Sequence, residues 1–246
     1  MYKLSVIFLN LWFYCLAPFV LAGSLLIYTP FVAAVRVFSR RRAMYYFRKS
    51  INLYGRSVGL STWPWIRIKV HNLPPPDGTP YVFVENHTSS FDPFVQGFLP
   101  YELVQAARGW ALRLPVLGLV AKFAGYLDVD ALSGEEMLKK ADKLLEQGVS
   151  VVFFPEGTRH PGPEMGPFHS LAFRTALGNS VPIVPVIIRG IADKPRKGSL
   201  LMRPGKIDIY CLDVIKPDDY SGKSAAGLKK YIRKIMEKAI TGYEEN

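Results

Sequence analysis

Short apolar runs recur along the second two thirds of the chain and predict buried strands. Each run is bounded by turn-forming residues, and a polar or amphipathic segment separates it from the next. The runs are "YVFVE" at 81–85, "VSVVFFP" at 149–155 and "VPIVPVII" at 181–188. Strands that alternate with helices predict an α/β fold with a mostly parallel sheet flanked by helices. In such a sheet, the loops after the strands carry the chemistry.

Helical periodicity is clearest in two segments. In the segment 131–148, Ser133 and Glu136 have the spacing of a capping box, and Gly148 can end the helix. The segment 224–243 places apolar residues on one side and lysines and arginines on the others. A helix of this second kind either covers a core or contacts a membrane surface with its basic face, and both interpretations stay open.

The N-terminal part has a different pattern. Residues 4–35 contain no charged side chain. This uncharged stretch is longer than the roughly 20 apolar residues of one membrane span but too short for two spans with a turn. Prolines and glycine within it are places for a kink or a return turn, and a basic hinge at 36–49 follows. We therefore expect a membrane-embedded helical segment. A cleaved signal peptide is the alternative, but the run is long and its flank is basic.

A short alternating segment at 66–70 predicts a strand, and Trp63 and Trp65 before it suit either a membrane interface or a core. Three prolines and an Asp-Gly pair follow. We place a boundary there, with residues 1–70 as the N-terminal membrane-associated segment and hinge, and residues 71–246 as the catalytic-type α/β domain.

Composition adds a strong positive charge. The 31 lysines and arginines exceed the 20 acids, giving +11, and basic surfaces favour anionic partners. No nucleic-acid motif is present, so we expect membrane lipid rather than nucleic acid, with the basic flank on the cytoplasmic side. Two distant cysteines, Cys15 and Cys211, form no disulfide framework and indicate a reducing compartment. The four histidines show no metal-ligand spacing.

The first candidate site is "NHTSSFD" at 86–92, directly after the first apolar run. His87 lies at a strand end, where parallel sheets present their functional groups. Neutral imidazole accepts a proton near neutral pH. Asp92 can accept a hydrogen bond from the other ring N–H and so stabilise the imidazolium. A histidine and an aspartate at this spacing also occur in ordinary hydrogen-bonded surface loops.

The second candidate is "FPEGTR" at 154–159. Gly157 permits a left-handed backbone that leaves N–H groups free to face an anion, and Arg159 offers a planar fork of donors for phosphate. Glu156 is better suited to orienting neighbours, such as Arg159, than to acting as a second base. The alternative is a plain turn with a solvated arginine.

The order of "NHTSSFD", "FPEGTR" and "VPIVPV" resembles the 1-acyl-glycerol-3-phosphate acyltransferases, a family of membrane-associated glycerolipid acyltransferases. The resemblance runs from about Tyr81 to Ile188. It implies His87 as the general base with Asp92 as its partner, and it implies acceptor-phosphate binding by Glu156, Gly157 and Arg159, with Thr158 in the same block. Residues 108–130 resemble the second block of the family, and residues 181–186 would help line the lipid cleft.

Two departures from the family pattern concern positive charge. Ala131 stands where the second block usually ends in an arginine, and His169 to Leu171 replace a Lys-Lys-Gly run. Both changes fall near the acceptor site and leave the acyl-transfer residues in place. They bear on which acceptor is used.

The resulting hypothesis is an O-acyltransferase that needs no cofactor. It would move a fatty acyl group from acyl-CoA or acyl-acyl carrier protein to the hydroxyl of a lysophospholipid, most simply 1-acyl-glycerol-3-phosphate, giving phosphatidic acid. Other lysolipids, including amino-acid-containing lipids, are alternative acceptors. A lipid hydrolase or a silent membrane-binding relative belongs to a different class, but no G-x-S-x-G elbow is present and His87 and Asp92 remain.

Overall fold

The computed structural model describes residues 2–160, 162, 164–196 and 198–244. Its residues cluster into two compact units that interleave along the chain. Unit 1 comprises residues 1–71, 88–102 and 188–209, and unit 2 comprises residues 72–87, 103–187 and 210–246. The chain crosses between the units next to the predicted boundary at residue 70, and it crosses again four times. The division into a membrane segment and an acyltransferase domain therefore stays a prediction.

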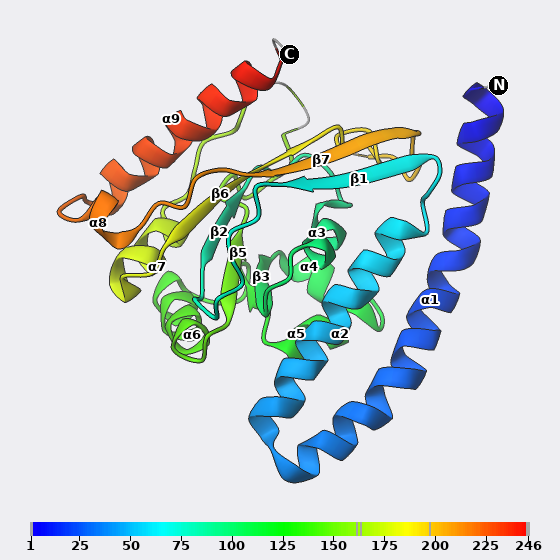
Figure 1. Cartoon of the computed structure of the whole chain (residues 1–246), viewed down its shortest axis with the longest axis horizontal. Helices are drawn as coiled ribbons and strands as arrows, with labels where there is room; N and C mark the ends of the chain where they lie inside the picture. Colours follow the sequence, from blue (N-terminus) through cyan, green and yellow to red (C-terminus); the bar gives the residue numbers. More distant parts are fainter. Residues whose placement is uncertain (1, 161, 163, 197, 245–246) are drawn as a thin grey trace. The chain divides into compact units, whose positions relative to one another are not determined.

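Unit 2 is built on a parallel sheet, as the alternating pattern predicted (Figure 1). Its strands follow the order β6-β2-β5-β3-β4, and each adjacent pair is parallel. The central strands β2 and β5 are mostly apolar and are buried on both faces, as is usual in parallel sheets. The strands are β2 (Val82–Glu85), β3 (Leu103–Ala107), β4 (Leu127–Asp128), β5 (Ser150–Phe153) and β6 (Ile183–Arg189), the last two residues of β6 lying in unit 1.

Three helices of unit 2 pack on one face of this sheet and share its core: α6 (Gly134–Glu146), α7 (Leu171–Asn179) and α9 (Ala225–Glu244). The predicted capping box is present in α6, because Ser133 and Glu136 exchange side-chain and backbone hydrogen bonds. Gly148, at φ +76°, follows the helix end. The apolar side of α9 is buried in the same core, as its periodicity predicted. The shorter helices are α4 (Gly109–Leu112), α5 (Leu117–Ala124) and α8 (Pro217–Tyr220).

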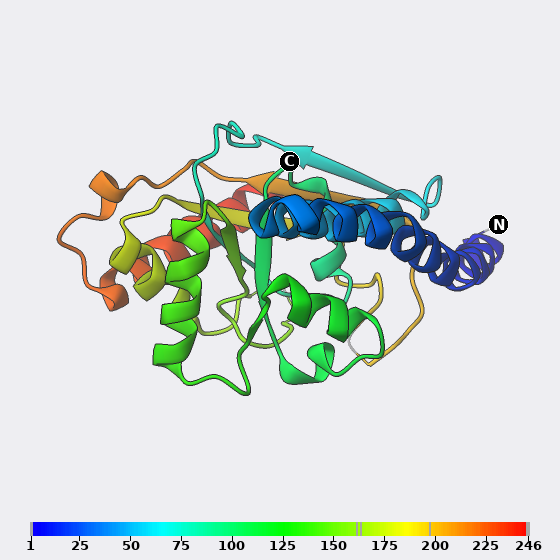
Figure 2. The same cartoon turned by 90° about the horizontal axis from the view of Figure 1, so that it is seen from below.

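Unit 1 contains two long helices that run side by side (Figures 1 and 2). Of the kink and the return turn that the sequence allowed inside residues 4–35, the return turn is absent, because α1 (Tyr2–Phe38) continues through Pro18 and Pro30. The turn falls instead at Ser39, whose hydroxyl caps α2 (Arg40–Leu60) by accepting the Arg42 N–H. The predicted basic hinge is therefore mostly the first half of α2. Each isolated proline removes one helical hydrogen bond and need not end the helix, whereas a polar residue that caps a helix marks the start of a new one.

The remaining elements of unit 1 are short. They are β1 (Ile66–His71), α3 (Asp92–Val95), the 3₁₀ helix η1 (Gln96–Phe98) and β7 (Gly205–Cys211), of which the last two residues lie in unit 2. The strand predicted at 66–70 is thus confirmed as β1. Of the two tryptophans before it, Trp63 is 67% exposed, and Trp65 is half-buried, with its ring centroid 6.5 Å from that of Trp12.

Polar contacts tie α2 to the segment that follows η1. Both Arg41 and Arg48 bind the carboxylate of Glu102, Arg41 in bidentate geometry at 2.8 and 2.9 Å and Arg48 at 2.9 Å. The side chain of Asn52 donates to the Tyr101 carbonyl at 2.8 Å. Gly97 lies so close to α2 that an added Cβ would be 2.2 Å from a backbone nitrogen of that helix. The amphipathic helix α2 is thus an integral part of unit 1.

Helix α1 packs against α2, and its first half also makes polar contacts with a later stretch of unit 1. Asn10 exchanges two hydrogen bonds with the backbone of Met202, both at 2.8 Å, and the Tyr14 hydroxyl donates to the Leu200 carbonyl. By length and composition α1 can cross a membrane: its most apolar 18-residue stretch has a mean hydropathy of 2.0, and only 11% of that stretch is buried. Such low burial is unlike the core helix of a soluble protein.

Candidate active site

The polar loops of unit 2 follow neighbouring parallel strands at the same edge of the sheet. β2 is followed by His87, β5 by residues 154–160, β3 by Arg108 and β4 by Asp130. Because β2, β5, β3 and β4 are adjacent and parallel, their carboxyl ends lie together, where α/β sheets bind their ligands. The sequence predicted this convergence for His87 and the loop after β5, and the structure confirms it.

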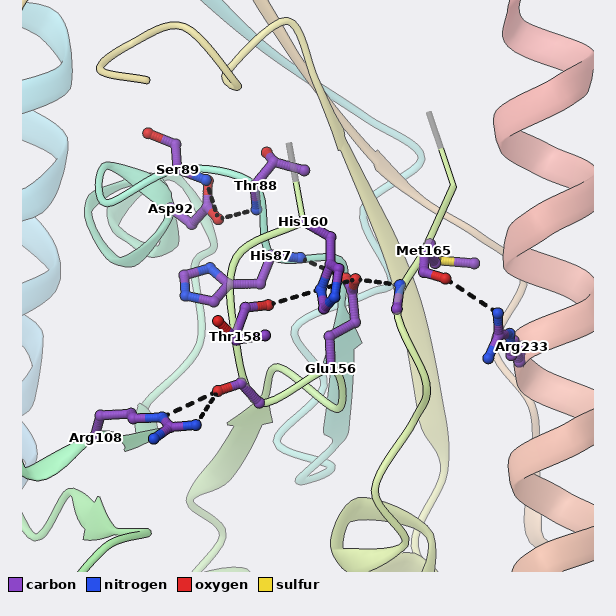
Figure 3. A network of polar contacts seen from close by, with 12 residues as sticks. His87, Thr88, Ser89, Asp92, Arg108, Glu156, Thr158, His160, Met165 and Arg233 are labelled. Atoms are coloured by element: carbon purple, nitrogen blue, oxygen red, sulfur yellow. Dashed lines mark hydrogen bonds and ion pairs between the residues drawn. The ribbon is translucent and has the colours of Figure 1, made fainter. Parts of the chain in front are cut away.

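The main chain of His87 is held on both sides (Figure 3). Its N–H donates to Oε1 of Glu156 at 2.9 Å, and its carbonyl oxygen accepts the N–H of His160 at 2.8 Å. The imidazole packs against the ring of Phe154, with the ring centroids 4.6 Å apart. The loop after β5 therefore fixes the position of His87 at the end of β2. We call these two backbone bonds the His87 clamp.

Glu156 is the centre of this arrangement. It is 3% exposed, and its second oxygen, Oε2, accepts the Gly166 N–H at 2.7 Å and lies 3.0 Å from Nδ1 of His160. The same Nδ1 lies 3.1 Å from the Thr158 carbonyl, so it faces two acceptors and carries the ring proton. Glu156 thus orients its neighbours, as expected, and the neighbours include His87 and Gly166. A direct contact between Glu156 and the substrate stays a prediction.

Gly157 has the left-handed backbone that the sequence predicted, with φ at +66°. The N–H of Gly157 itself donates to the Phe154 carbonyl at 3.0 Å and closes a turn, and the expectation that N–H groups of this loop face an anion stays a prediction. An added Cβ would also lie 3.0 Å from the His169 ring. Glycine is favoured here by the backbone conformation, and a larger residue would also have to move the His169 ring.

Arg108 is one residue of this site that the sequence analysis did not single out, as are two of the partners of Glu156 named above. Its Nε and Nη2 atoms both donate to the Gly157 carbonyl, at 3.0 and 2.9 Å, and its side chain is 53% exposed. Its Nη1 lies 3.7 Å from Asp130. The available signal was position, since Arg108 is the first residue after β3. A cation therefore lies against the loop after β5, although Ala131 supplies none.

Thr158 is exposed and Arg159 is half-buried in the same loop. Their predicted contacts with the phosphate of an acceptor stay predictions. The backbone N–H of Ala131 donates to Asp128 at 3.2 Å, and the N–H of His169 donates to the Pro155 carbonyl at 2.7 Å. Ala131 thus lies in the loop between β4 and α6, and the second departure leads into the start of α7.

Asp92 belongs to unit 1, where it begins α3. Its Oδ2 accepts the N–H groups of Thr88 and Ser89 at 2.8 and 3.0 Å, and its side chain is fully buried. The side chain therefore reaches back across one turn, as the five-residue spacing allowed. The chain passes from unit 2 to unit 1 between His87 and Thr88. The pairing of Asp92 with the His87 ring stays a prediction.

Comparison with known proteins identifies the class. The family model described as Acyltransferase matches residues 67–189, half of the chain. The chain therefore belongs to the acyltransferase family, as the resemblance of its motifs indicated. The matched segment contains His87, Asp92 and the loop after β5.

Individual relatives narrow this class. The chain is 30% identical over 177 residues to the 1-acyl-sn-glycerol-3-phosphate acyltransferase of Limnanthes douglasii, and 32% identical over 180 residues to the alpha form from Mus musculus. These matches cover 69% and 70% of this chain, but only 63% and 62% of the relatives. A solved structure, the 1-acyl-sn-glycerophosphate acyltransferase PlsC from Thermotoga maritima, has a TM-score of 0.78 at 25% identity. That match covers 100% of this chain and 99% of the other.

Proposed function

We propose that this protein transfers a fatty acyl group from an acyl thioester to the free hydroxyl of 1-acyl-glycerol-3-phosphate, yielding phosphatidic acid. The observation that carries the proposal is the His87 clamp, which joins the histidine after β2 to the loop after β5. That loop is the one expected to bind the phosphate of the acceptor. The activity for which the relatives and the solved structure are named supports the same proposal. The acyl donor is acyl-CoA or acyl-acyl carrier protein, and the reaction needs no cofactor.

In this mechanism His87 removes the proton from the acceptor hydroxyl, and the oxygen attacks the thioester carbonyl. The C–O bond forms, the C–S bond breaks, and His87 returns its proton to the departing thiolate. The tetrahedral intermediate places negative charge on the former carbonyl oxygen, which requires donors in a preorganised site. The Gly157 N–H is already bonded within its turn, so other backbone N–H groups of the two loops must serve.

The preferred acceptor carries a phosphate monoester because two arginines belong to this edge of unit 2. Arg159 offers a planar fork of donors, and Arg108 lies against the loop that contains it. Other lysolipids, including amino-acid-containing ones, are the nearest alternative acceptors. Comparing them with a single acyl thioester, and reading the products by mass spectrometry, distinguishes these possibilities.

The setting of the reaction follows from the N-terminal part of the chain. α1 is apolar and exposed, and arginines follow it at the start of α2. Excess positive charge beside an apolar helix favours the cytoplasmic face, where anionic headgroups are found. We place the active site on that side of the membrane, within reach of a water-soluble acyl donor and a membrane-held acceptor.

The test is His87→Ala in purified protein, with thiol release from an acyl thioester as the readout. Loss of a positioned base should lower kcat by about 10²–10⁴-fold. The matched control is His71→Ala, which removes a histidine that contacts Asp208 in unit 1 at 2.8 Å. Near-normal turnover by the His87 variant, with acceptor-dependent product, would show that His87 is not the base.

A further inference from the structure

One segment of unit 2 exposes far more apolar surface than the rest of that unit. Among the described residues of unit 2, seven large hydrophobic side chains are exposed, and five of them fall within residues 110–123. Soluble surfaces scatter such residues singly, whereas a cluster marks an interaction site. We call this cluster the 110–123 patch. It consists of Trp110 (50% exposed), Leu114 (42%), Val116 (45%), Leu119 (63%) and Phe123 (61%).

The patch sits on a firmly packed base. Leu112, Gly118 and Ala124 of the same segment are buried, and an added Cβ at Gly118 would lie 2.4 Å from the Leu112 carbonyl oxygen. The close packing joins α4 to α5 and leaves the apolar side chains on the outside. In Figures 1 and 2 these two short helices lie at the end of unit 2 remote from α9. The exposed side chains are therefore held outward by the fold.

The segment that carries the patch contains cations and no acid of its own, although Asp130 accepts the N–H of Gly109 at its start. Residues 109–127 contain Arg113 and Lys122, both exposed, and no aspartate or glutamate. A tryptophan, several aliphatic residues and cations on one short surface are the composition of segments that lie in the headgroup region of a bilayer. In a symmetric dimer through this patch, like charges would approach each other. An acidic protein partner would match the cations but would leave most of the apolar area unexplained.

We infer that the 110–123 patch inserts into the interfacial region of an anionic membrane, giving unit 2 a lipid contact of its own in addition to the long apolar helix α1 of unit 1. The apolar side chains enter the boundary between headgroups and acyl chains, and Arg113 and Lys122 meet lipid phosphates. This contact concerns the surface of unit 2, and it stands whichever acyl acceptor the enzyme uses.

The experiment places an environment-sensitive fluorophore on single cysteines in the full-length protein. Cys15→Ser removes the exposed thiol, while buried Cys211 remains in place. Cysteines are introduced as Leu119→Cys, Phe123→Cys and, for the matched control, Lys139→Cys on the exposed face of α6 in the same unit. The proteins are reconstituted into vesicles of neutral lipid with or without anionic lipid, and quenchers are carried on the lipid at the glycerol level.

We expect the labels at 119 and 123 to shift to shorter wavelength and to be quenched in anionic vesicles, while the label at 139 reports water. Arg113→Gln and Lys122→Gln should each weaken this insertion by about fivefold. Water-like emission from positions 119 and 123 in vesicle-bound protein would overturn the inference. Energy transfer between labelled copies at these positions, or protection only when an acidic carrier protein is added, would overturn it in favour of a protein partner.

Discussion

Glu156 provides the sharpest test of how the site is built. Glu156→Ala removes the acceptor of two buried N–H donors, those of His87 at 2.9 Å and Gly166 at 2.7 Å. Each unsatisfied donor costs about 1–3 kcal/mol, so the free energy of unfolding should fall by about 2–6 kcal/mol. Glu156→Gln keeps the shape and one acceptor oxygen but turns an NH₂ group toward one of the donors. We expect it to lose roughly 1–3 kcal/mol and to remain folded.

The catalytic effect of Glu156→Gln should exceed what lost stability explains. A weakened His87 clamp displaces the imidazole, and a misplacement of about 1 Å can cost about 100-fold in rate. Measured by thiol release below the unfolding temperature, kcat should fall about 10- to 100-fold, with KM for the acyl thioester changing much less. Glu146→Gln, an exposed change at the end of α6, is the matched control and should alter neither quantity.

The pH profile of kcat separates positioning from proton transfer. If Glu156 only positions His87, the Gln variant keeps the ionisation limbs of the wild-type profile at a lower plateau. Loss of a limb would mean that Glu156 itself exchanges a proton in the reaction. Unchanged kcat and unchanged unfolding free energy in the Gln variant would refute the clamp altogether.

Three further predictions concern the frame around the site. Gly97→Ala should destabilise the protein by about 1–3 kcal/mol in denaturant unfolding, because its Cβ would lie 2.2 and 2.3 Å from backbone atoms of α2; wild-type stability would mean that α2 and η1 pack less closely. Arg48→Met should cost about 1.5–3 kcal/mol in the same assay because it removes one buried charged donor of Glu102 while Arg41 stays bound, and Arg48→Met with Glu102→Leu should recover much of that loss, whereas an undiminished loss would locate the cost elsewhere. Burial, together with the charge of Glu85, raises the pKa of the Cys211 thiol to about 12 from an ordinary 9.0, so its thiolate is scarce at pH 8. Thiol reagents should therefore label Cys15 alone until the protein is unfolded. Equal labelling of both cysteines in the folded protein would contradict this prediction.

The sequence revealed most of unit 2 because its signals are local. The capping box of α6, the apolar runs of the parallel strands and the left-handed Gly157 each depend on a few adjacent residues. The position of Arg108 could not be found in this way, because its partner, the Gly157 carbonyl, is 49 residues away and belongs to the backbone. The partners of Glu156 were missed for the same reason, since two of its three contacts are backbone N–H groups.

The helix boundaries of unit 1 were harder to predict, because the residues that usually interrupt a helix do not stand where α1 ends. Prolines suggested a turn inside the apolar run, yet α1 continues through both of them and ends before Ser39. The cluster of arginines after Ser39 was predicted to be part of a basic hinge. In the structure two of these arginines hold Glu102, which no local pattern reveals because the acid follows more than fifty residues later.

The two hydrogen bonds between Asn10 and Met202, and the contacts of two α2 arginines with Glu102, determine how this protein can be truncated. Deleting both α1 and α2 to gain a more tractable fragment would remove the partners of two stretches far downstream, around residues 97–102 and 200–202. A buried carboxylate would lose both of its cations at once. What looks in the sequence like a detachable tether is part of the scaffold that those later stretches need in order to stay folded.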